Sequence, residues 1–318
     1  MRRRAVVTGV AGFIGSNLAD KLLAEGFEVV GIDNLAYGVL EQVPAGVEFH
    51  EEDIRGDRLE ARFRGAGVVY HLAAKNCIAD CQADPVETAD INVTGSVKVF
   101  EAARRAGVPK VVYAESSALY EGVARMPTPE AEVRPESFYA VSKLAGMAFA
   151  DAYRRWSGMR MTALRYFCVY GPRQDYRRTI PPVMSAFIIK LLRGERPVIY
   201  GTGRKRRDFV YVDDVNDFHL LCLADARTDG RVFNVGSGVS YSVREIYDVI
   251  ARLLGSDVEP EHRADLPGEA EETLADVTAA GSLGWSPRID LETGLRRSIA
   301  FIREHVVTRA TAVAPGAA

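Results

Sequence analysis

The sequence contains little cysteine, and the spacing excludes two common uses of that residue. Four cysteines occur in 318 residues, with no CxxC pair and no Cys/His cluster at metal-ligand spacing. We therefore expect neither a disulfide framework nor a metal site. Cys77 and Cys81 are near enough in sequence for a redox pair, but scattered thiols of this kind are more typical of a protein that stays reduced in the cytoplasm.

A strong charge of either sign is also missing. The chain has 40 Lys and Arg against 43 Asp and Glu, a net charge of −3, so no electrostatic attraction to nucleic acid or an anionic membrane is expected. The Met-Arg-Arg-Arg start is similar to the first region of a signal peptide, but a glycine-rich turn follows, and no apolar run is long enough to span a bilayer. We expect a cytoplasmic protein without nucleic-acid or membrane partners.

Short apolar runs alternate with longer stretches of helical periodicity through the first half of the chain. The runs are continuous in character, as in strands buried on both faces. Such alternation predicts parallel strands joined by right-handed crossovers, which is a doubly wound α/β sheet. The expected strands are 5–8, 28–32, 47–50, 68–73, 110–114 and 161–167, and the expected helices are 12–25, 86–106 and 138–156.

The second half is less regular and predicts a smaller C-terminal α/β lobe against the carboxyl edge of the sheet. A helix is expected to follow Pro181-Pro182, because proline suits a first helical turn. Further strands are expected at 198–200, 209–212 and 232–235, and further helices at 213–224 and 242–254. We divide the chain into a sheet domain at 1–165, a smaller lobe at 166–305 with part of 207–230 returning to the sheet domain, and a flexible tail at 306–318.

Three glycines stand where the first strand becomes the first helix. In Thr8-Gly9-Val10-Ala11-Gly12-Phe13-Ile14-Gly15, Gly9 permits a tight turn, and Gly12 lets backbone N–H groups approach a pyrophosphate. Gly15 lets the helix pack closely on the sheet. The spacing is GxxGxxG, one residue longer than the common dinucleotide fingerprint.

Carboxylates at the ends of the next two strands make this motif more specific. Asp33 follows Gly15 by 18 residues, where a carboxylate binds both hydroxyls of an adenosine ribose and repels a 2′-phosphate, so NAD is preferred over NADP. Asp53, after the third strand, is placed to lie near the adenine amino group.

Tyr139 and Lys143 are four residues apart in a helix-like segment and therefore share one helix face. An ammonium beside a phenol, with a positive nicotinamide nearby, favours phenolate, so the pattern predicts a lowered pKa for Tyr139 and a role as general base. Lys143 is also placed to hold the nicotinamide ribose. Ser116 lies at the carboxyl end of the preceding strand, the edge where such sheets bind ligands.

The chain resembles the extended short-chain dehydrogenases/reductases of the nucleotide-sugar epimerase/dehydratase family, in particular those like UDP-glucose 4-epimerase. The resemblance implies a Rossmann domain that binds NAD and a smaller lobe that binds a nucleotide sugar. The segments that carry it span nearly the whole chain in the family's order: TGVAGFIGSNL, VVGIDNL, VYHLAA, INVTGSVKVFEAAR, SSALY, YAVSK, ALRYFCVYGPRQ, YGTGRKRRDFVYVDDV, FNVGSG and LGWSPRIDLETGL.

The resemblance assigns site residues one by one. It implies Ser116, Tyr139 and Lys143 as catalytic residues, and Arg207 as the cation that grips the substrate diphosphate. Ser117 and Cys168 fall at further substrate-binding positions. The implied cofactor contacts are Gly9, Gly12, Phe13, Ile14, Gly15, Asp33, Asn34, Asp53, Ile54, Leu72, Ala73, Ala74, Asn92, Tyr139 and Lys143.

Several positions depart from the family pattern. Dehydratases of the group carry Asp-Glu after the catalytic residue, where this chain has Ser117 and Ala118, which favours 4-epimerisation over dehydration. The family commonly has Asn at the position of Cys168 and Arg at the position of Leu266. The identity of the sugar, and of a second cation for the diphosphate, therefore stays open. A glycine usually stands at Glu121.

The first hypothesis is therefore an NAD-dependent 4-epimerase acting on a UDP-hexose through a transient 4-keto sugar. A second keeps the same oxidation but ends in dehydration, decarboxylation or net dehydrogenation of another activated sugar. A third is a non-catalytic NAD-binding regulator on the same fold. The resemblance also implies a homodimer that pairs helices 86–106 and 138–156 of each subunit.

Overall fold

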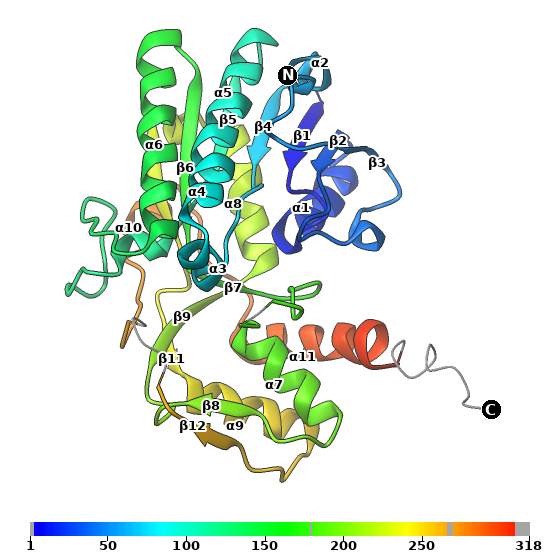
Figure 1. Ribbon diagram of the computed structural model, residues 1–318, viewed down its shortest axis with the longest axis vertical. Helices are drawn as coiled ribbons and strands as arrows, with labels where there is room; N and C mark the ends of the chain where they lie inside the picture. Colours follow the sequence, from blue (N-terminus) through cyan, green and yellow to red (C-terminus); the bar gives the residue numbers. More distant parts are fainter. Residues whose placement is uncertain (1–2, 179, 266–269, 309–318) are drawn as a thin grey trace.

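The computed structural model describes residues 3–178, 180–265 and 270–308. Its main element is a seven-stranded sheet, parallel throughout, in the order β10-β6-β5-β4-β1-β2-β3 (Figure 1). This confirms the expected doubly wound sheet, with the switch point between β1 and β4. The strands are β1 (Arg4–Thr8), β2 (Glu28–Asp33), β3 (Val47–Glu51), β4 (Val68–His71), β5 (Lys110–Ser116), β6 (Arg160–Tyr166) and β10 (Arg231–Val235).

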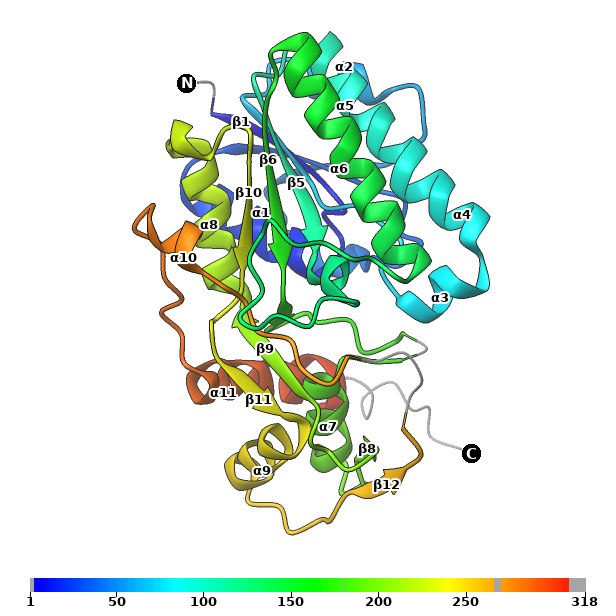
Figure 2. The same cartoon turned by 90° about the vertical axis from the view of Figure 1, so that its left-hand side faces the viewer.

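Helices cover both faces of this sheet (Figure 2). Successive strand residues point to opposite faces, so Val7 packs in one apolar cluster with α1 (Phe13–Ala24) and α8 (Val212–Ala224). Val6 packs in the other cluster, with α2, α5 and α6. Both clusters are closed to water, which explains why the strands read as continuous apolar runs. The helices of the second face are α2 (Leu59–Phe63), α5 (Ser96–Arg105) and α6 (Phe138–Ser157).

The single helix expected at 86–106 is three segments. The chain forms α4 (Pro85–Ala89), then a π-helical turn η2 (Asp90–Gly95), and then α5. The π turn carries Asn92, whose side chain reaches back to the loop after β4. Such turns inside longer helices are often found at functional sites, and here the widened turn carries the residue that holds the loop after β4.

The smaller lobe lies below the carboxyl ends of the large sheet and has its own apolar core (Figure 1). It holds a three-stranded sheet in the order β11-β9-β7 and a two-stranded sheet of β12 and β8. These strands are β7 (Cys168–Tyr170), β8 (Val198–Tyr200), β9 (Arg206–Tyr211), β11 (Ser240–Ser242) and β12 (Glu261–Arg263). The lobe's helical segments are α7 (Val183–Leu192), α9 (Val243–Leu254), α11 (Leu291–Ile302) and η5 (Arg303–Thr308).

The chain passes repeatedly between the two sheets. After β9 in the smaller lobe, α8 and β10 return to the large sheet, and β10 pairs with β6. The returning segment is therefore 212–235, whereas the sequence places it within 207–230. The helical turn η5 extends to Thr308, three residues into the expected tail, and 309–318 lie outside the described residues.

The remaining short segments connect these elements: η1 (Leu40–Gln42), α3 (Ile78–Ala83), η3 (Ser117–Tyr120), η4 (Ala226–Thr228) and α10 (Thr278–Gly281). Within the described ranges no helix has both the length and the apolar character needed to cross a bilayer. None of the four cysteines forms a disulfide in that part of the chain.

Candidate active site

A cleft of about 1090 Å³ lies along the carboxyl ends of the large sheet and extends to the smaller lobe. This volume exceeds that of most single-ligand pockets, so the cleft has room for two ligands side by side. Nearly all the predicted site residues line it: Gly9, Gly12, Phe13, Ile14, Gly15, Asp33, Asn34, Asp53, Ile54, Leu72, Ala73, Ala74, Ser116, Ser117, Tyr139, Lys143, Cys168 and Arg207. Asn92 is buried behind the wall.

The glycine turn brings the N-terminus of α1 to the cleft. Gly12 is the N-cap of α1 and supplies no side-chain cap, so the first N–H groups of the helix face the cleft. Gly9 has a φ of +74°, and a Cβ there would lie 2.8 Å from the backbone nitrogen of Ala73. A Cβ on Gly15 would lie 2.1 Å from the carbonyl oxygen of Gly9. The turn therefore leaves an uncapped helix N-terminus, which is an anion-binding feature.

Asp33, at the end of β2, is held by the same turn. One carboxylate oxygen accepts the backbone N–H of Ala11 at 3.0 Å, and the other accepts that of Leu35 at 2.8 Å. Burial raises the pKa of Asp33, and these two amide donors oppose the rise. The carboxylate is thus fixed in orientation at the mouth of the glycine turn.

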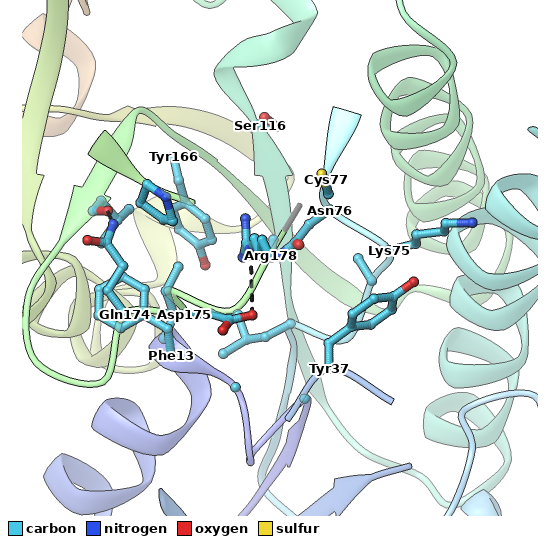
Figure 3. Close-up of a pocket in the computed structure, with 18 of the residues that line it drawn as sticks. Phe13, Tyr37, Lys75, Asn76, Cys77, Ser116, Tyr166, Gln174, Asp175 and Arg178 are labelled. Atoms are coloured by element: carbon cyan, nitrogen blue, oxygen red, sulfur yellow. Dashed lines mark hydrogen bonds and ion pairs between the residues drawn. The ribbon is translucent and has the colours of Figure 1, made fainter. Parts of the chain in front are cut away.

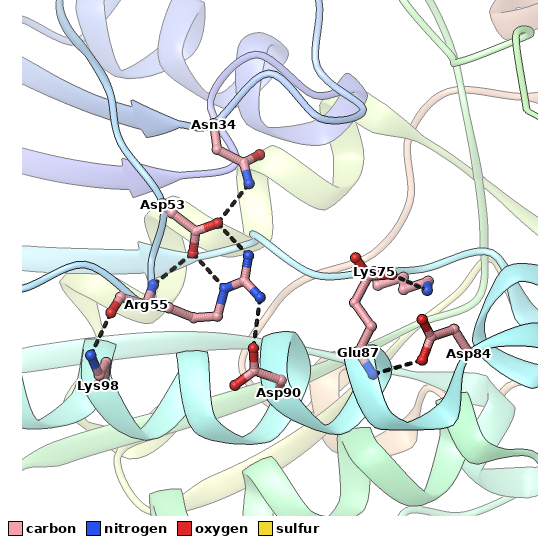
Figure 4. Close-up of polar contacts among 8 residues, drawn as sticks. All are labelled: Asn34, Asp53, Arg55, Lys75, Asp84, Glu87, Asp90 and Lys98. Atoms are coloured by element: carbon pink, nitrogen blue, oxygen red, sulfur yellow. Dashed lines mark hydrogen bonds and ion pairs between the residues drawn. The ribbon is translucent and has the colours of Figure 1, made fainter.

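Asn34 and Asp53 form one polar cluster on the β2–β3 side of the cleft (Figure 4). The Asn34 amide donates to Asp53 at 2.9 Å. Arg55 donates to both carboxylate oxygens of Asp53, at 2.9 and 2.7 Å, and its other guanidinium nitrogen reaches Asp90 at 2.7 Å. Hydrogen bonding from Arg55 holds the pKa of Asp53 well below its usual range. Asp53 is therefore a fixed anion tied to the start of η2.

Asn92 connects the loop after β4 with α6. Its side-chain oxygen accepts the backbone N–H of Lys75 at 2.8 Å, and its amide donates to the carbonyl of Lys75 and to the Ser142 hydroxyl, both at 2.9 Å. Ser142 in turn donates to the carbonyl of Tyr139 at 2.7 Å. One buried amide thus couples the cleft-lining loop to the helix that carries Tyr139 and Lys143.

Ser116, at the end of β5, and Tyr139, in the first turn of α6, meet at the cleft. Ser116 lies near enough to the phenol to act on its pKa, and its hydroxyl accepts the backbone N–H of Ala118 at 3.1 Å. Burial raises the pKa of Tyr139, while Ser116 and the charge of Arg178 oppose the rise. The lowered pKa that the sequence predicts is therefore wrong for the protein's own groups, because burial outweighs them.

Lys143 lies one turn after Tyr139, and its side chain is 3% exposed. Its ammonium nitrogen sits 4.6 Å from the centre of the Tyr113 ring. Burial lowers the pKa of Lys143 to about 8, and the negative charge of Glu115 opposes the fall. Glu115 is itself buried and paired with Arg165 on the neighbouring strand. Lys143 is thus a cation close to its titration point at neutral pH.

The substrate-side candidates lie on three different elements. Ser117 begins η3, Cys168 begins β7, and Arg207 is on β9, where one guanidinium nitrogen donates to the carbonyl of Arg206 at 2.9 Å. All three line the cleft. Leu266, the position where the family commonly has Arg, lies outside the described residues.

The sequence analysis missed a polar segment after β7 that enters the cleft (Figure 3). Asp175 pairs with Arg178 at 3.6 Å, and Arg177 donates to the carbonyl of Tyr37, on the far wall, at 3.3 Å. Figure 3 shows Arg178 between Tyr166 and Asn76. Two adjacent arginines in the loop that follows β7, seven and eight residues after its last residue Tyr170, were the available signal.

The sequence model of one family matches residues 5–236, and its description is the NAD dependent epimerase/dehydratase family. The chain belongs to this family. The predicted family is thereby confirmed, and the expected cofactor is the one in the family's name.

Individual members of the family cover almost the same length. A UDP-glucose 4-epimerase of Mycolicibacterium smegmatis is 37% identical over 310 residues, spanning 94% of this chain and 98% of that protein. The crystal structure of UDP-glucose 4-epimerase from Thermotoga maritima with UDP-glucose is 35% identical, covers 95% and 99% of the two chains and has a TM-score of 0.91. The Thermus thermophilus UDP-glucose 4-epimerase complex with NAD is 34% identical, covers 95% and 100%, and has a TM-score of 0.89.

Proposed function

We propose that this family member is an NAD-dependent nucleotide-sugar 4-epimerase that acts on a UDP-hexose through a transient 4-keto sugar. The observation that carries the proposal is the convergence of Ser116, Tyr139 and Lys143 on one cleft with the uncapped N-terminus of α1. The names of the relatives support the reaction, since UDP-glucose 4-epimerases match this chain over nearly its full length.

The residues of the glycine turn fit NAD. The uncapped N–H groups at Phe13 and Ile14 suit a pyrophosphate, and Asp33 stands where a ribose diol would be held. In our assignment Asn34 supports that ribose, and Asp53 and Ile54 lie beside the adenine. Leu72, Ala73 and Ala74 would line the rest of the cofactor's binding site, and Asn92 holds the loop that carries them. When bound, NAD accepts and returns the hydride at C4 of the sugar.

Tyr139 takes the proton of the 4-hydroxyl group, directly or through Ser116, and returns it after the sugar has turned over. Lys143, one turn along the same helix, would hold the nicotinamide ribose and supply the positive charge that favours the phenolate. The desolvation that raises the pKa of Tyr139 also weakens dielectric screening, so a nearby positive charge acts strongly on the phenolate. Each turnover therefore ends with Tyr139 in its starting protonation state.

The residues after Ser116 favour epimerisation over dehydration. Loss of water from the sugar needs an added acid and base beside the 4-keto group. Ser117 and Ala118 stand at those positions and supply neither at neutral pH. Glu121, the next carboxylate along the chain, has both oxygens bonded to the start of α6.

We assign substrate binding to Arg207, Ser117 and Cys168. A guanidinium suits a diphosphate because it donates two parallel hydrogen bonds. Ser117, next to Ser116 in the chain, and Cys168 line the same cleft, where they would contact the sugar. Cys168 has a small thiol where the family commonly has an amide, so the hexose that binds there is identified by the substrate panel below.

Incubation with a panel of UDP-sugars, including N-acetylated and uronic forms, tests the function. We expect 4-epimers without net change in the absorbance of reduced nicotinamide; lasting reduction would mean a dehydrogenase, and loss of CO₂ a decarboxylase. No conversion of any nucleotide sugar would favour an NAD-binding regulator. Tyr139→Phe should lower kcat by about 10²- to 10⁴-fold. Tyr153→Phe, on the same helix but bonded to Glu101 away from the cleft, is the matched control.

The assembly we propose is a homodimer formed through the segment 86–106, which is α4, η2 and α5, and through α6. Exposed apolar side chains follow one face of α6 at helical spacing, and Val86 on α4 is 79% exposed. Such a stripe on a surface helix is typical of a protein interface. The stripe on α6 consists of Phe138, Val141, Phe149 and Trp156.

Light scattering at micromolar concentration tests the dimer. Phe149→Glu with Val86→Glu should give a monomer, because the charges would be buried in the interface. Val239→Glu, which changes an exposed apolar residue of the smaller lobe, should remain dimeric. A wild-type monomer would refute the assignment. We also place the protein in the cytoplasm, where reduced thiols and nucleotide sugars occur together.

A further inference from the structure

Glu121, the first residue after η3, links the turn that begins at Ser116 to the start of α6. One of its carboxylate oxygens accepts the backbone N–H groups of Glu136 at 3.0 Å and of Ser137 at 2.7 Å. The other accepts the hydroxyl of Ser137 at 2.8 Å. Both oxygens are therefore bonded to the two residues that precede the helix.

The bonded serine is the N-cap of the helix that carries Tyr139. The Ser137 hydroxyl accepts the backbone N–H of Ala140 at 3.1 Å, so it is both held by Glu121 and holding the first turn. A carboxylate at this end also interacts favourably with the helix dipole. The orientation of the first turn, and of Tyr139 within it, thus depends on this carboxylate.

Backbone pairing alone does not reach the helix. After η3 the chain forms a loop, residues 122–135, that comes back beside η3. The backbone N–H of Arg134 donates to the carbonyl of Leu119 at 2.7 Å, and the N–H of Gly122 donates to the carbonyl of Arg134 at 3.0 Å. Pairing between these two segments ends there, three residues before the N-cap. The side chain of Glu121 spans the gap.

Ser116 and Glu121 are the two ends of the same short turn. Ser116 is the N-cap of η3 and Glu121 is its C-cap residue. A second link reaches α6 from the other side, where Gln82 of α3 accepts the backbone N–H of Phe138 at 2.9 Å. Of these two attachments, the one through Glu121 connects the turn that carries Ser116 to the helix that carries the Tyr139 phenol.

We propose that Glu121 is a positioning residue that sets the hydroxyl of Ser116 against the phenol of Tyr139. The inference rests on the proposed function, since it assigns those two groups to proton transfer. Misplacing a catalytic group by about 1 Å lowers rates by roughly 10²-fold.

A double-mutant cycle with Ser116 tests the proposal. We expect Glu121→Ala to lower kcat about 10- to 100-fold, with KM for the UDP-sugar within about threefold. In a Ser116→Ala background the same change should lower kcat by less than about threefold, because the alignment is already lost. Glu121→Gln keeps the size and one acceptor oxygen and should recover part of the rate.

The matched control is Glu132→Ala, which removes a carboxylate from the loop 122–135, where it pairs with Arg125. It should keep wild-type kcat. Equal effects of Glu121→Ala with and without Ser116 would mean a purely structural role and overturn the proposal. So would wild-type activity in Glu121→Ala, or failure of both Glu121 variants to fold. Wild-type protein that converts no nucleotide sugar would refute the proposed function and this inference with it. If the wild type is active, the Glu121 variants test the positioning role alone.

Discussion

The ammonium of Lys143 lies 4.6 Å from the centre of the Tyr113 ring, so a charged group is stabilised by a buried aromatic face. Tyr113 is fully buried, and its hydroxyl donates to the carbonyl of Lys143 at 3.3 Å. The ring fills the space that water would need around the ammonium. Burial by this ring and its neighbours lowers the pKa of Lys143 to about 8, while the attraction of the ammonium to the ring face favours the charged form.

The first prediction concerns the pH dependence of turnover. Lys143 is protonated below its pKa of about 8 and neutral above it, so kcat should fall as the pH rises through that value. The unfolded chain keeps this proton up to about 10.5, and between the two values the unfolded state binds more protons. The contribution of Lys143 to the free energy of unfolding therefore rises with pH there. A kcat profile that is flat to pH 9.5, with the fold followed by circular dichroism, would contradict this assignment.

A second prediction concerns cofactor choice at Asp33. Asp33→Asn places an amide donor against the N–H of either Ala11 or Leu35, so one hydrogen bond becomes a repulsion. We expect the Kd for NAD to rise about 10- to 100-fold, with a smaller preference over NADP. Calorimetric titration measures both. Asp57→Asn changes an exposed carboxylate nearby and should leave binding as it was.

Asn92→Ala should uncouple the loop after β4 from α6. The change leaves the N–H of Lys75 without a partner and its carbonyl with only the Cys81 thiol as donor, so unfolding in urea should show a loss of about 2 kcal/mol. We expect kcat to fall about 10-fold as well. Ser142→Ala removes the α6 end of the link alone and should lower kcat with less loss of stability. A normal kcat in a destabilised Asn92→Ala protein would mean that Asn92 contributes to stability and not to turnover.

Arg207→Ala should weaken substrate binding and spare the chemistry. Losing a bidentate grip on a diphosphate raises KM by about 10- to 100-fold, while kcat stays within about threefold. Steady-state kinetics over a range of UDP-sugar concentration gives both values. The control is Arg204→Ala, an exposed arginine three residues earlier. An unchanged KM in Arg207→Ala would place the diphosphate elsewhere.

The long elements could be predicted from the sequence because their periodicity follows from their burial. The strands of the large sheet alternate between two closed apolar clusters, and α6 is amphipathic over 20 residues. Three-residue strands such as β7 and β11 are too short for any period to appear. The π turn at Asn92 was not predicted, because a single widened turn has no spacing signal of its own within the helical stretch 86–106.

The same distinction applies to the site. The glycine turn and the pair Tyr139 and Lys143 are local in sequence, so their spacing is readable. The contact of Glu121 with Ser137 joins residues 16 apart, and that of Gln82 with Phe138 joins residues 56 apart. The direction of the Tyr139 pKa was missed for a related reason, because desolvation depends on every segment that covers the phenol.

The return of α8 and β10 to the large sheet bears on any attempt to divide this protein. A fragment ending at 165 would lack β10, so β6 would become an open edge with unpaired N–H and carbonyl groups. It would also lack α8, and with it part of the covering over Val7 and Tyr70. Neither half is a self-sufficient folding unit, and we expect such fragments to aggregate rather than to bind their separate ligands.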